Sequence, residues 1–355
     1  MSKHLLVGLL FAGAALPSLA APYKCHFLED RGGEFNATPF AINDQGTAVG
    51  YAYFGVSSRA VRWKPGGRQV ELEPLSGNGT SHAYGVNAGG TVVGTSQDEL
   101  YRYRATVWHG RRPTALPGLP GAHPGSHAAA VNAQGWVVGH AAIPQDQLRY
   151  HATVWRDGQV SDLGTLGSPG LRSAAWSIND AGIVVGHSEV SPNVEHAARW
   201  NSVGEIEDLG TLPGGLRSWA REINRDGLVA GESEYDTQSG RVHATVWDAN
   251  GPRKLGGLPG HANSRAWGLN DAGVVVGESG ANWYTTFAVV WFAPDQAAIA
   301  LKDLLGAKGC TDKAGRAYDL SSAQGVNQAG EIIATGRHVG SDRAYNAAFK
   351  LTPKP

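Results

Sequence analysis

Six ionisable side chains recur along this sequence at intervals of 45 to 47 residues. They form two series, His82 and His127 in one and His140, His187, Glu232 and Glu278 in the other. Zinc, manganese or another divalent ion could be bound by imidazole and carboxylate groups that surround one opening. The same groups could act as an acid–base pair, contact a non-metal ligand, or stand as solvated polar residues. The elements that position them decide among these readings.

The interval comes from a segment that occurs seven times, as in "SINDAGIVVGHS" (177–188). Each copy has a strand-like run, a break at Asn-x-x-Gly and a second strand-like run. The turn asparagines are Asn43, Asn87, Asn132, Asn179, Asn224, Asn270 and Asn327. A period near 45 residues is typical of propeller blades or helical arrays. Short apolar runs split by glycine turns favour the blades, because helices need a 3.6-residue periodicity.

Each unit carries four strand-like pieces, as at 173–179, 183–188, 196–200 and 206–212. The last unit stops at its third piece, 347–351, whereas residues 23–30 precede the first unit as a spare strand. We expect 23–30 to pair with 346–351 and to complete the last blade, which removes the exposed edges of an open array. The predicted fold is therefore all-β, a seven-bladed β-propeller closed by the N-terminal strand. It occupies residues 21–355 as a single domain with an insertion near 305–320.

In such a blade, the start of the first strand and the end of the second strand lie on the same face. Five residues before each asparagine the chain has Thr38, His82, His127, Ala174, Trp219, Arg265 and Ser322. Eight residues after it the chain has Tyr51, Thr95, His140, His187, Glu232, Glu278 and Thr335. Both sets are predicted to ring one rim of the central channel. The candidate ligand-binding residues are His82, His127, Trp219, Arg265, His140, His187, Glu232 and Glu278, and the last four are the candidate metal ligands.

Two other repeated residue types are predicted to be structural. The asparagines suit tight turns better than calcium loops, because most copies lack the carboxylates that calcium needs. Six tryptophans end the third strands: Trp63, Trp108, Trp155, Trp200, Trp247 and Trp291. We expect them to pack between neighbouring blades rather than to stack on sugars. The last unit has Lys350 where a tryptophan is expected.

The bulk composition limits the compartment and the partners. Residues 1–20 resemble a secretory signal peptide cleaved near Ala20, and no second long apolar run occurs. Removal of Lys3 leaves 29 basic and 31 acidic residues, with no basic block that would hold a nucleic acid. Cys25 and Cys310 are a candidate disulfide pair in an oxidising compartment, although the chain separation leaves two free thiols as the alternative.

The strings "HATVW", "DGQVSDLGTLG" and "INDAGIVVGHS", in that order, resemble the HAF-repeat family of bacterial extracellular repeat proteins. The resemblance spans roughly residues 37–350. It implies export and a repeat architecture, but little about chemistry. The sequence departs from the pattern at Lys350, at the insertion, and where arginine replaces histidine in two third strands.

We therefore expect a monomeric secreted or periplasmic protein without a cofactor, unless a divalent metal is bound at the rim. It would bind a glycan, a peptide or a cell-surface partner on the rim formed by the loops between second and third strands. These loops are 52–58, 95–103, 140–150, 187–195, 232–242, 278–286 and 336–345. The alternative function is a propeller hydrolase or lyase with its chemistry at the His/Glu rim.

Overall fold

The computed structural model describes residues 22–30, 36–144, 146–202, 204–237, 239–282, 285–340 and 346–354. The predicted signal peptide, residues 1–20, lies outside these ranges. So do parts of the predicted loops 140–150, 232–242, 278–286 and 336–345. In the described part of the chain, no helix is long and apolar enough to cross a membrane.

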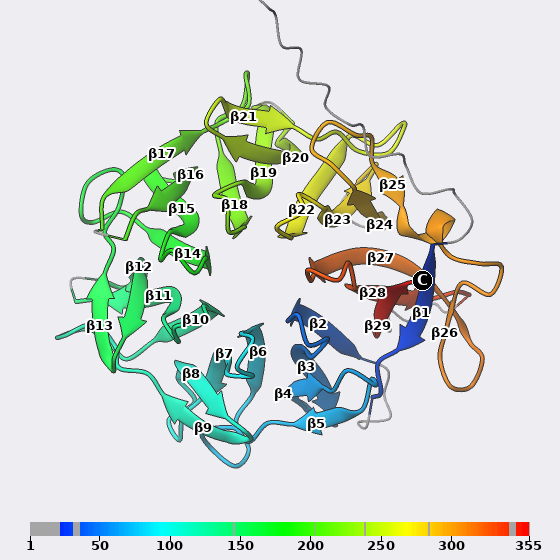
Figure 1. Ribbon diagram of the computed structural model, residues 1–355. Coiled ribbons are helices and arrows are strands. Elements are labelled where there is room, and N and C mark those ends of the chain that lie inside the picture. Colours follow the sequence, from blue (N-terminus) through cyan, green and yellow to red (C-terminus); the bar gives the residue numbers. More distant parts are fainter. Residues whose placement is uncertain are drawn as a thin grey trace, which may run out of the picture.

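Seven antiparallel sheets are arranged in a ring, so the seven-bladed β-propeller is confirmed (Figure 1). The innermost strands of all seven sheets line a central channel. The innermost strands are β2 (Ala37–Ile42), β6 (Ser81–Val86), β10 (Ser126–Val131), β14 (Ser173–Ile178), β18 (Ser218–Ile223), β22 (Asn263–Leu269) and β27 (Ala317–Val326). The second strands are β3 (Ala48–Phe54), β7 (Val92–Gln97), β11 (Val137–Ile143), β15 (Val184–Ser191), β19 (Val229–Asp236), β23 (Val275–Gly280) and β28 (Ile332–His338). We number the blades 1 to 7 in this order.

The outer half of each blade completes the four-stranded sheet. The third strands are β4 (Ser57–Trp63), β8 (Tyr103–His109), β12 (Asp146–Arg156), β16 (Val194–Trp200), β20 (Arg241–Asp248), β24 (Thr286–Trp291) and β29 (Asn346–Pro353). The fourth strands are β5 (Gln69–Glu71), β9 (Arg112–Ala115), β13 (Gln159–Asp162), β17 (Ile206–Gly210), β21 (Gly251–Lys254), β25 (Ile299–Ala300) and, in blade 7, β1 (Tyr23–Phe27).

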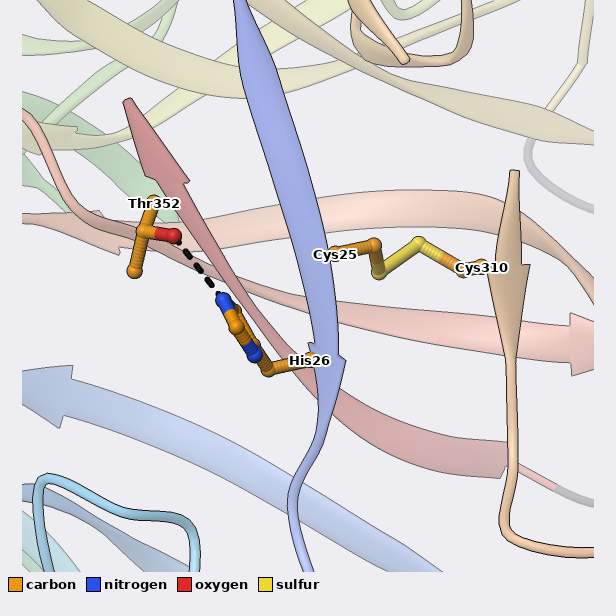
Figure 2. Close-up of a disulfide and its surroundings, with 4 residues drawn as sticks. All are labelled: Cys25, His26, Cys310 and Thr352. Atoms are coloured by element: carbon orange, nitrogen blue, oxygen red, sulfur yellow. Dashed lines mark hydrogen bonds between the residues drawn. A yellow bond between two sulfur atoms is a disulfide. The ribbon is translucent and has the colours of Figure 1, made fainter. Parts of the chain in front are cut away.

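The N-terminal strand closes the ring, as expected from the sequence. β1 pairs antiparallel with β29, from Tyr23 opposite Pro353 to Phe27 opposite Phe349. The predicted insertion contributes the short strand β26 (Cys310–Thr311), which pairs with the start of β27. It follows the 3₁₀ helix η1 (Leu301–Leu304). β26 brings Cys310 to Cys25 of β1, and the two form a disulfide with their Cα atoms 5.4 Å apart (Figure 2). The insertion thus ties the closing strand into blade 7.

Each turn asparagine has two roles. Its side-chain oxygen accepts a hydrogen bond from the backbone N–H four residues on, at 2.9–3.1 Å, which fixes the turn inside its own blade. Its side-chain N–H donates to the backbone carbonyl of the asparagine in the next blade, at 2.9–3.3 Å. The seventh of these bonds runs from Asn327 back to Asn43 at 3.1 Å and closes the circle. We call these seven hydrogen bonds the asparagine ring.

The six third-strand tryptophans are buried between blades, at 0–2% exposure. Each indole N–H donates at 2.7–3.2 Å to a backbone carbonyl of the preceding blade or its connecting segment. Trp63 reaches Glu29, directly after β1, so the closing strand takes part in the same contact. In blade 7 the pairing places Leu351, rather than Lys350, in the tryptophan position, because Leu351 lies opposite Ile332. The prediction for Lys350 was one residue out of register.

Replacing Trp155 by alanine is expected to lower the free energy of unfolding by roughly 3–5 kcal/mol, because it empties a packed site between blades. The change also leaves the Pro117 carbonyl without the indole N–H that bonds it at 2.8 Å. Urea unfolding monitored by circular dichroism measures the change. Trp155→Phe, which fills most of the site, serves as the control and should cost less. A loss below about 1 kcal/mol for the alanine variant would show that the tryptophans do not hold the blades together.

Candidate functional site

The strand register pairs the two predicted rim series with each other. His82 lies opposite Thr95, His127 opposite His140, Ala174 opposite His187, Trp219 opposite Glu232, and Arg265 opposite Glu278. Each blade therefore presents one pair of these side chains at the same height. The frame that holds them is repeated, whereas the side chains differ from blade to blade. The predicted rim is a set of non-repeated side chains on a repeated frame.

A β-bulge in every innermost strand adds a second set that the sequence analysis missed. The register shifts three residues before each asparagine, and the extra residue there lines the channel. The bulged residues are Phe40, Tyr84, Ala129, Trp176, Arg221, Trp267 and Gln324. With the asparagine turns, they line a channel cavity of about 770 Å³. A period-two strand pattern gives no sign of a bulge, although the change of residue type at this position is visible in the sequence.

Aromatic and imidazole rings form a continuous line of contacts across blades 1 to 3. We call Tyr51, His82, Tyr84, His127, His140 and Tyr150 the aromatic row. The ring centroids of Tyr51 and His82 are 4.4 Å apart, and those of Tyr84 and His127 are also 4.4 Å apart. His127 and His140 stack nearly parallel, with centroids 4.9 Å apart, and Tyr150 lies 4.6 Å from His140. Trp176 of blade 4 meets both stacked imidazoles edge-on.

Burial keeps the imidazoles of His127, His140 and His187 uncharged at neutral pH. Burial, and to a smaller extent the neighbouring imidazoles, lower the pKa of His127 well below the usual range and the pKa of His140 to about 4. The pKa of His187 falls to about 3 through burial and then through Arg221 and Arg172. His187 Nδ1 accepts a hydrogen bond from the Trp176 indole at 3.0 Å. At neutral pH these three imidazoles are therefore uncharged hydrogen-bonding groups.

Arginine–glutamate ion pairs occupy the rim in blades 5 and 6. The Arg221 guanidinium bonds Glu232 at 2.6 Å and faces the rings of Trp176 and Trp267, 5.4 and 5.1 Å from their centroids. Arg265 lies 3.5 Å from Glu278. Trp219 donates its indole N–H to Glu195 at 2.7 Å. Both predicted glutamates are therefore neutralised by an arginine of their own blade.

The structure does not bring the four candidate metal ligands together as a metal site. His140 stacks on His127, His187 bonds Trp176, and Glu232 and Glu278 pair with arginines. Zinc needs its ligand atoms within about 2.0–2.2 Å of one point. Within the described ranges, no group of three or more His, Cys, Asp or Glu side chains could hold a metal ion. The four side chains lie at equivalent positions of four blades, but each contacts a different partner.

A second cavity, of about 630 Å³, opens between blades 2 and 3, and we call it the His–Tyr pocket. Its lining includes His82, Tyr84, Thr95, Tyr101, Arg102, Tyr103, His123, His127, His140, Arg149 and Tyr150. Three of its buried polar atoms, Thr95 Oγ1, His127 Nδ1 and His140 Nδ1, have no hydrogen-bond partner in the described structure. Buried polar groups are almost always bonded in folded proteins. Their gathering in one pocket marks a polar place that water or a polar ligand would fill.

The sequence matches no protein-family model and no curated protein. Solved structures of similar fold include a streptogramin B lyase, with 12% identity, 94% of this chain and 98% of that chain covered, and a TM-score of 0.55. The β-propeller domain of the Trilobed protease from Pyrococcus furiosus has 10% identity over 89% of this chain and 95% of that chain, with a TM-score of 0.53. A puromycin-hydrolyzing peptidase of Mycobacterium tuberculosis has 14% identity and a TM-score of 0.55 over 86% of this chain, which spans 50% of that chain. At such identities the likeness shows the fold alone.

The buried imidazoles predict a loss of stability in acid. Their pKa is near 6.5 in the unfolded chain and about 4 and 3 for His140 and His187 in the folded protein, so the unfolded chain takes up protons first as the pH falls. The free energy of unfolding should therefore decrease between pH 6.5 and pH 4, by about 2–3 kcal/mol for each of the two imidazoles. Urea unfolding at a series of pH values measures this slope.

The double variant His140→Gln/His187→Gln should reduce the slope of that profile, while His127 and His243, whose pKa values burial also lowers, keep part of it. His109→Gln, at an exposed position of β8, is the matched control. A double variant with the full wild-type slope would show that these two residues contribute nothing to the acid sensitivity.

Proposed function

We propose that this chain is an exported binding protein that holds a glycan, a peptide or a cell-surface partner on the rim formed by the second-to-third strand loops. The observation that carries the proposal is the aromatic row beside a pocket with unpartnered buried polar atoms. Binding sites combine such apolar and aromatic walls with a few placed polar groups. In the aromatic row, all of these groups come from positions that the repeat leaves free to vary.

The low pKa values of the buried imidazoles favour binding over catalysis. A general base works best with a pKa near the operating pH. His140 and His187, with pKa values of about 4 and 3, are weak proton acceptors at neutral pH. As neutral groups they still donate and accept hydrogen bonds, which suits ligand recognition. The same burial that weakens them as bases therefore prepares them as contacts.

The loops of this rim extend the surface beyond the pocket. Val56, Leu100, Tyr101 and Val339 are exposed apolar side chains, and all four lie in or beside the turns between second and third strands. Exposed apolar groups gathered on one face are typical of interaction surfaces. A macromolecular ligand would contact these loops as well as the aromatic row.

Export is part of the proposal. It is supported by the apolar N-terminal segment of the sequence and by the disulfide between Cys25 and Cys310, because such bonds persist in oxidising compartments. We also propose, from the sequence motifs quoted above, that the chain belongs to the HAF-repeat family.

A hydrolase or lyase is the second candidate, with its chemistry in the channel lining rather than at the His/Glu rim that the sequence suggested. Solved structures of similar fold include a streptogramin B lyase and a puromycin-hydrolyzing peptidase. The observation in favour is Glu222, on β18 in the channel lining, whose pKa burial raises to about 7 while the Ser177 hydroxyl donates to it. A carboxyl with a pKa near neutrality can both give and take a proton. Glu222 faces the channel beside the asparagine turns, away from the His–Tyr pocket.

A glycan and peptide array followed by calorimetry tests the binding function. His127→Ala should weaken the best ligand at least about tenfold, because it removes one ring of the stacked pair and one of the unpartnered nitrogens. The matched control is His243→Ala, which removes another buried histidine stacked on a tyrosine, Tyr235, in blade 5. Equal affinity in the two variants would place the ligand elsewhere. Turnover of the ligand that Glu222→Gln abolishes would favour the enzyme.

A further inference from the structure

The His–Tyr pocket combines uncharged polar atoms with aromatic walls. We propose that it binds a neutral oligosaccharide, seating one uncharged sugar residue against its histidines and tyrosines. The inference rests on the binding function proposed above and goes beyond it by naming the class of ligand. Three features carry it: the unpartnered polar atoms, the neutral state of those atoms, and the tyrosine walls.

The unpartnered atoms face the pocket from two neighbouring blades. Thr95 belongs to blade 2, whereas His127 and His140 form one cross-strand pair of blade 3. Thr95 is only 4% exposed, and its hydroxyl has no hydrogen-bond partner in the described structure. The Nδ1 atoms of the two stacked imidazoles are also buried without a partner there. Leaving a buried polar group unbonded costs stability, so a ligand that bonds these atoms removes part of that cost.

These atoms match the hydrogen bonding of sugar hydroxyls. A threonine hydroxyl both donates and accepts, and an imidazole nitrogen does one or the other according to its tautomer. A sugar hydroxyl also does both, so it can adapt to either tautomer. The peptide group has fixed roles instead, because its N–H only donates and its carbonyl only accepts. The unpartnered atoms therefore favour a polyhydroxyl ligand over a peptide backbone.

The groups that are free to bond the ligand are uncharged at neutral pH. Burial lowers the pKa of His127 well below the usual range and that of His140 to about 4. It also raises the pKa of the Tyr84 phenol to about 12. A charged ligand group seated on these atoms would lose its hydration without meeting an opposite charge, which is costly. A neutral sugar avoids that cost.

The two arginines of the lining have partners within the protein. The Arg102 guanidinium bonds the Asp98 carboxylate at 2.8 Å, and Arg149 donates to the Gly170 carbonyl. The proposal therefore gives neither arginine a charge of the ligand to bind.

Tyrosines form the walls of the pocket. Tyr84 and Tyr150 belong to the aromatic row, with ring centroids 4.4 and 4.6 Å from those of His127 and His140. A tyrosine presents an apolar ring face and a polar hydroxyl at its edge. A sugar ring has the same division, with C–H groups on its faces and hydroxyls around its edge. The walls therefore suit a sugar ring that lies flat against them.

The size of the pocket suits more than one sugar residue. Its volume of about 630 Å³ lies in the range of roughly 300–1,000 Å³ that is usual for small-molecule sites. Tyr101 and Tyr103 also line the pocket, and they are 72% and 47% exposed. They extend the aromatic surface toward solvent, where a second residue of the glycan would contact them. An oligosaccharide should therefore bind more tightly than its monosaccharide.

The test begins with an array of neutral oligosaccharides of about three to five residues, namely fragments of β-glucan, xylan, galactan and mannan. Oligogalacturonate and a set of peptides are included as charged and non-glycan probes. Calorimetry then measures the affinity of the best neutral oligosaccharide and of its monosaccharide. We expect at least one neutral oligosaccharide to bind more tightly than every charged or peptide probe.

Variants of one wall tyrosine test where the sugar lies. Tyr150→Ala should weaken the best neutral oligosaccharide at least about tenfold, whereas Tyr150→Phe, which keeps the ring, should weaken it by less than about threefold. Tyr235→Ala is the matched control, because Tyr235 also stacks on a buried histidine, His243, but lies outside the pocket lining. The control should bind with wild-type affinity.

Thr95→Val separates binding from folding. It replaces a buried, unpartnered hydroxyl by a methyl group of similar size, so the variant should be at least as stable as wild type to urea. It should nevertheless bind the neutral oligosaccharide several-fold more weakly, because one hydrogen bond to the ligand is lost.

The failures are distinguishable. Tight binding of peptides or of oligogalacturonate alone would overturn the inference and leave a binding protein of another specificity. A neutral oligosaccharide that Thr95→Val and Tyr150→Ala both bind with wild-type affinity would also overturn it, since the sugar would lie outside the pocket. Binding of no glycan, peptide or surface extract by a folded protein would overturn the proposed function itself.

Discussion

The asparagine ring is the constraint on which the rest of the molecule depends. Seven side-chain amides, each 2–8% exposed, bond the backbone of the next blade in turn, and the last reaches the first. A buried polar group that loses a partner is costly. Each asparagine carbonyl also accepts the backbone N–H of the glycine three residues on, so the loss of one member removes one of the two bonds to the next carbonyl and the side-chain bond that fixes its own turn. A closed ring of equal steps requires each blade to present its asparagine at the same place. This requirement accounts for seven near-copies of one segment in a single chain.

Because the ring fixes the inner ends of the blades, other repeated positions complete the same frame further out. The indole bonds join third strands to the preceding blade. Serine hydroxyls at the start of the first strands accept backbone N–H groups of the preceding blade in the same way. The positions left free are the rim pairs, the bulged residues, the second-to-third strand loops and the starts of the third strands. Together they carry the aromatic row, the arginine–glutamate pairs and the His–Tyr pocket.

The sequence predicts the frame well because each of its parts repeats. The strands, the closing pair of β1 with β29, the buried tryptophans and the rim pairs all follow from the period and from strand alternation. The sequence left the pairing of Cys25 with Cys310 open, because chain separation says nothing of distance across a closed ring. The position of Lys350 was misjudged by one residue, because no tryptophan marks the register in the last blade.

The site is less predictable because it depends on departures from the repeat. A bulge displaces Tyr84, Trp176 and Arg221 into the channel, and strand alternation cannot show it. The pairing of Glu232 with Arg221 follows from that bulge, and it removes a candidate metal ligand. The lining of the His–Tyr pocket also includes Tyr101, whose positive backbone φ of 58° is not visible in the sequence pattern. The interval between repeats predicted the position of these residues along their strands, but not which side chains they contact.

Replacing Asn179 by alanine tests the central claim most directly, since its amide bonds Asn224 at 3.1 Å and its oxygen accepts from Ala181 and Ile183. Urea unfolding is compared with that of Asp226→Ala, an exposed residue of the next turn. The account predicts a loss of about 2–4 kcal/mol in the free energy of unfolding for Asn179→Ala and less than about 0.5 kcal/mol for the control. An Asn179→Ala protein as stable as the control would contradict the claim that the asparagine ring holds the propeller together.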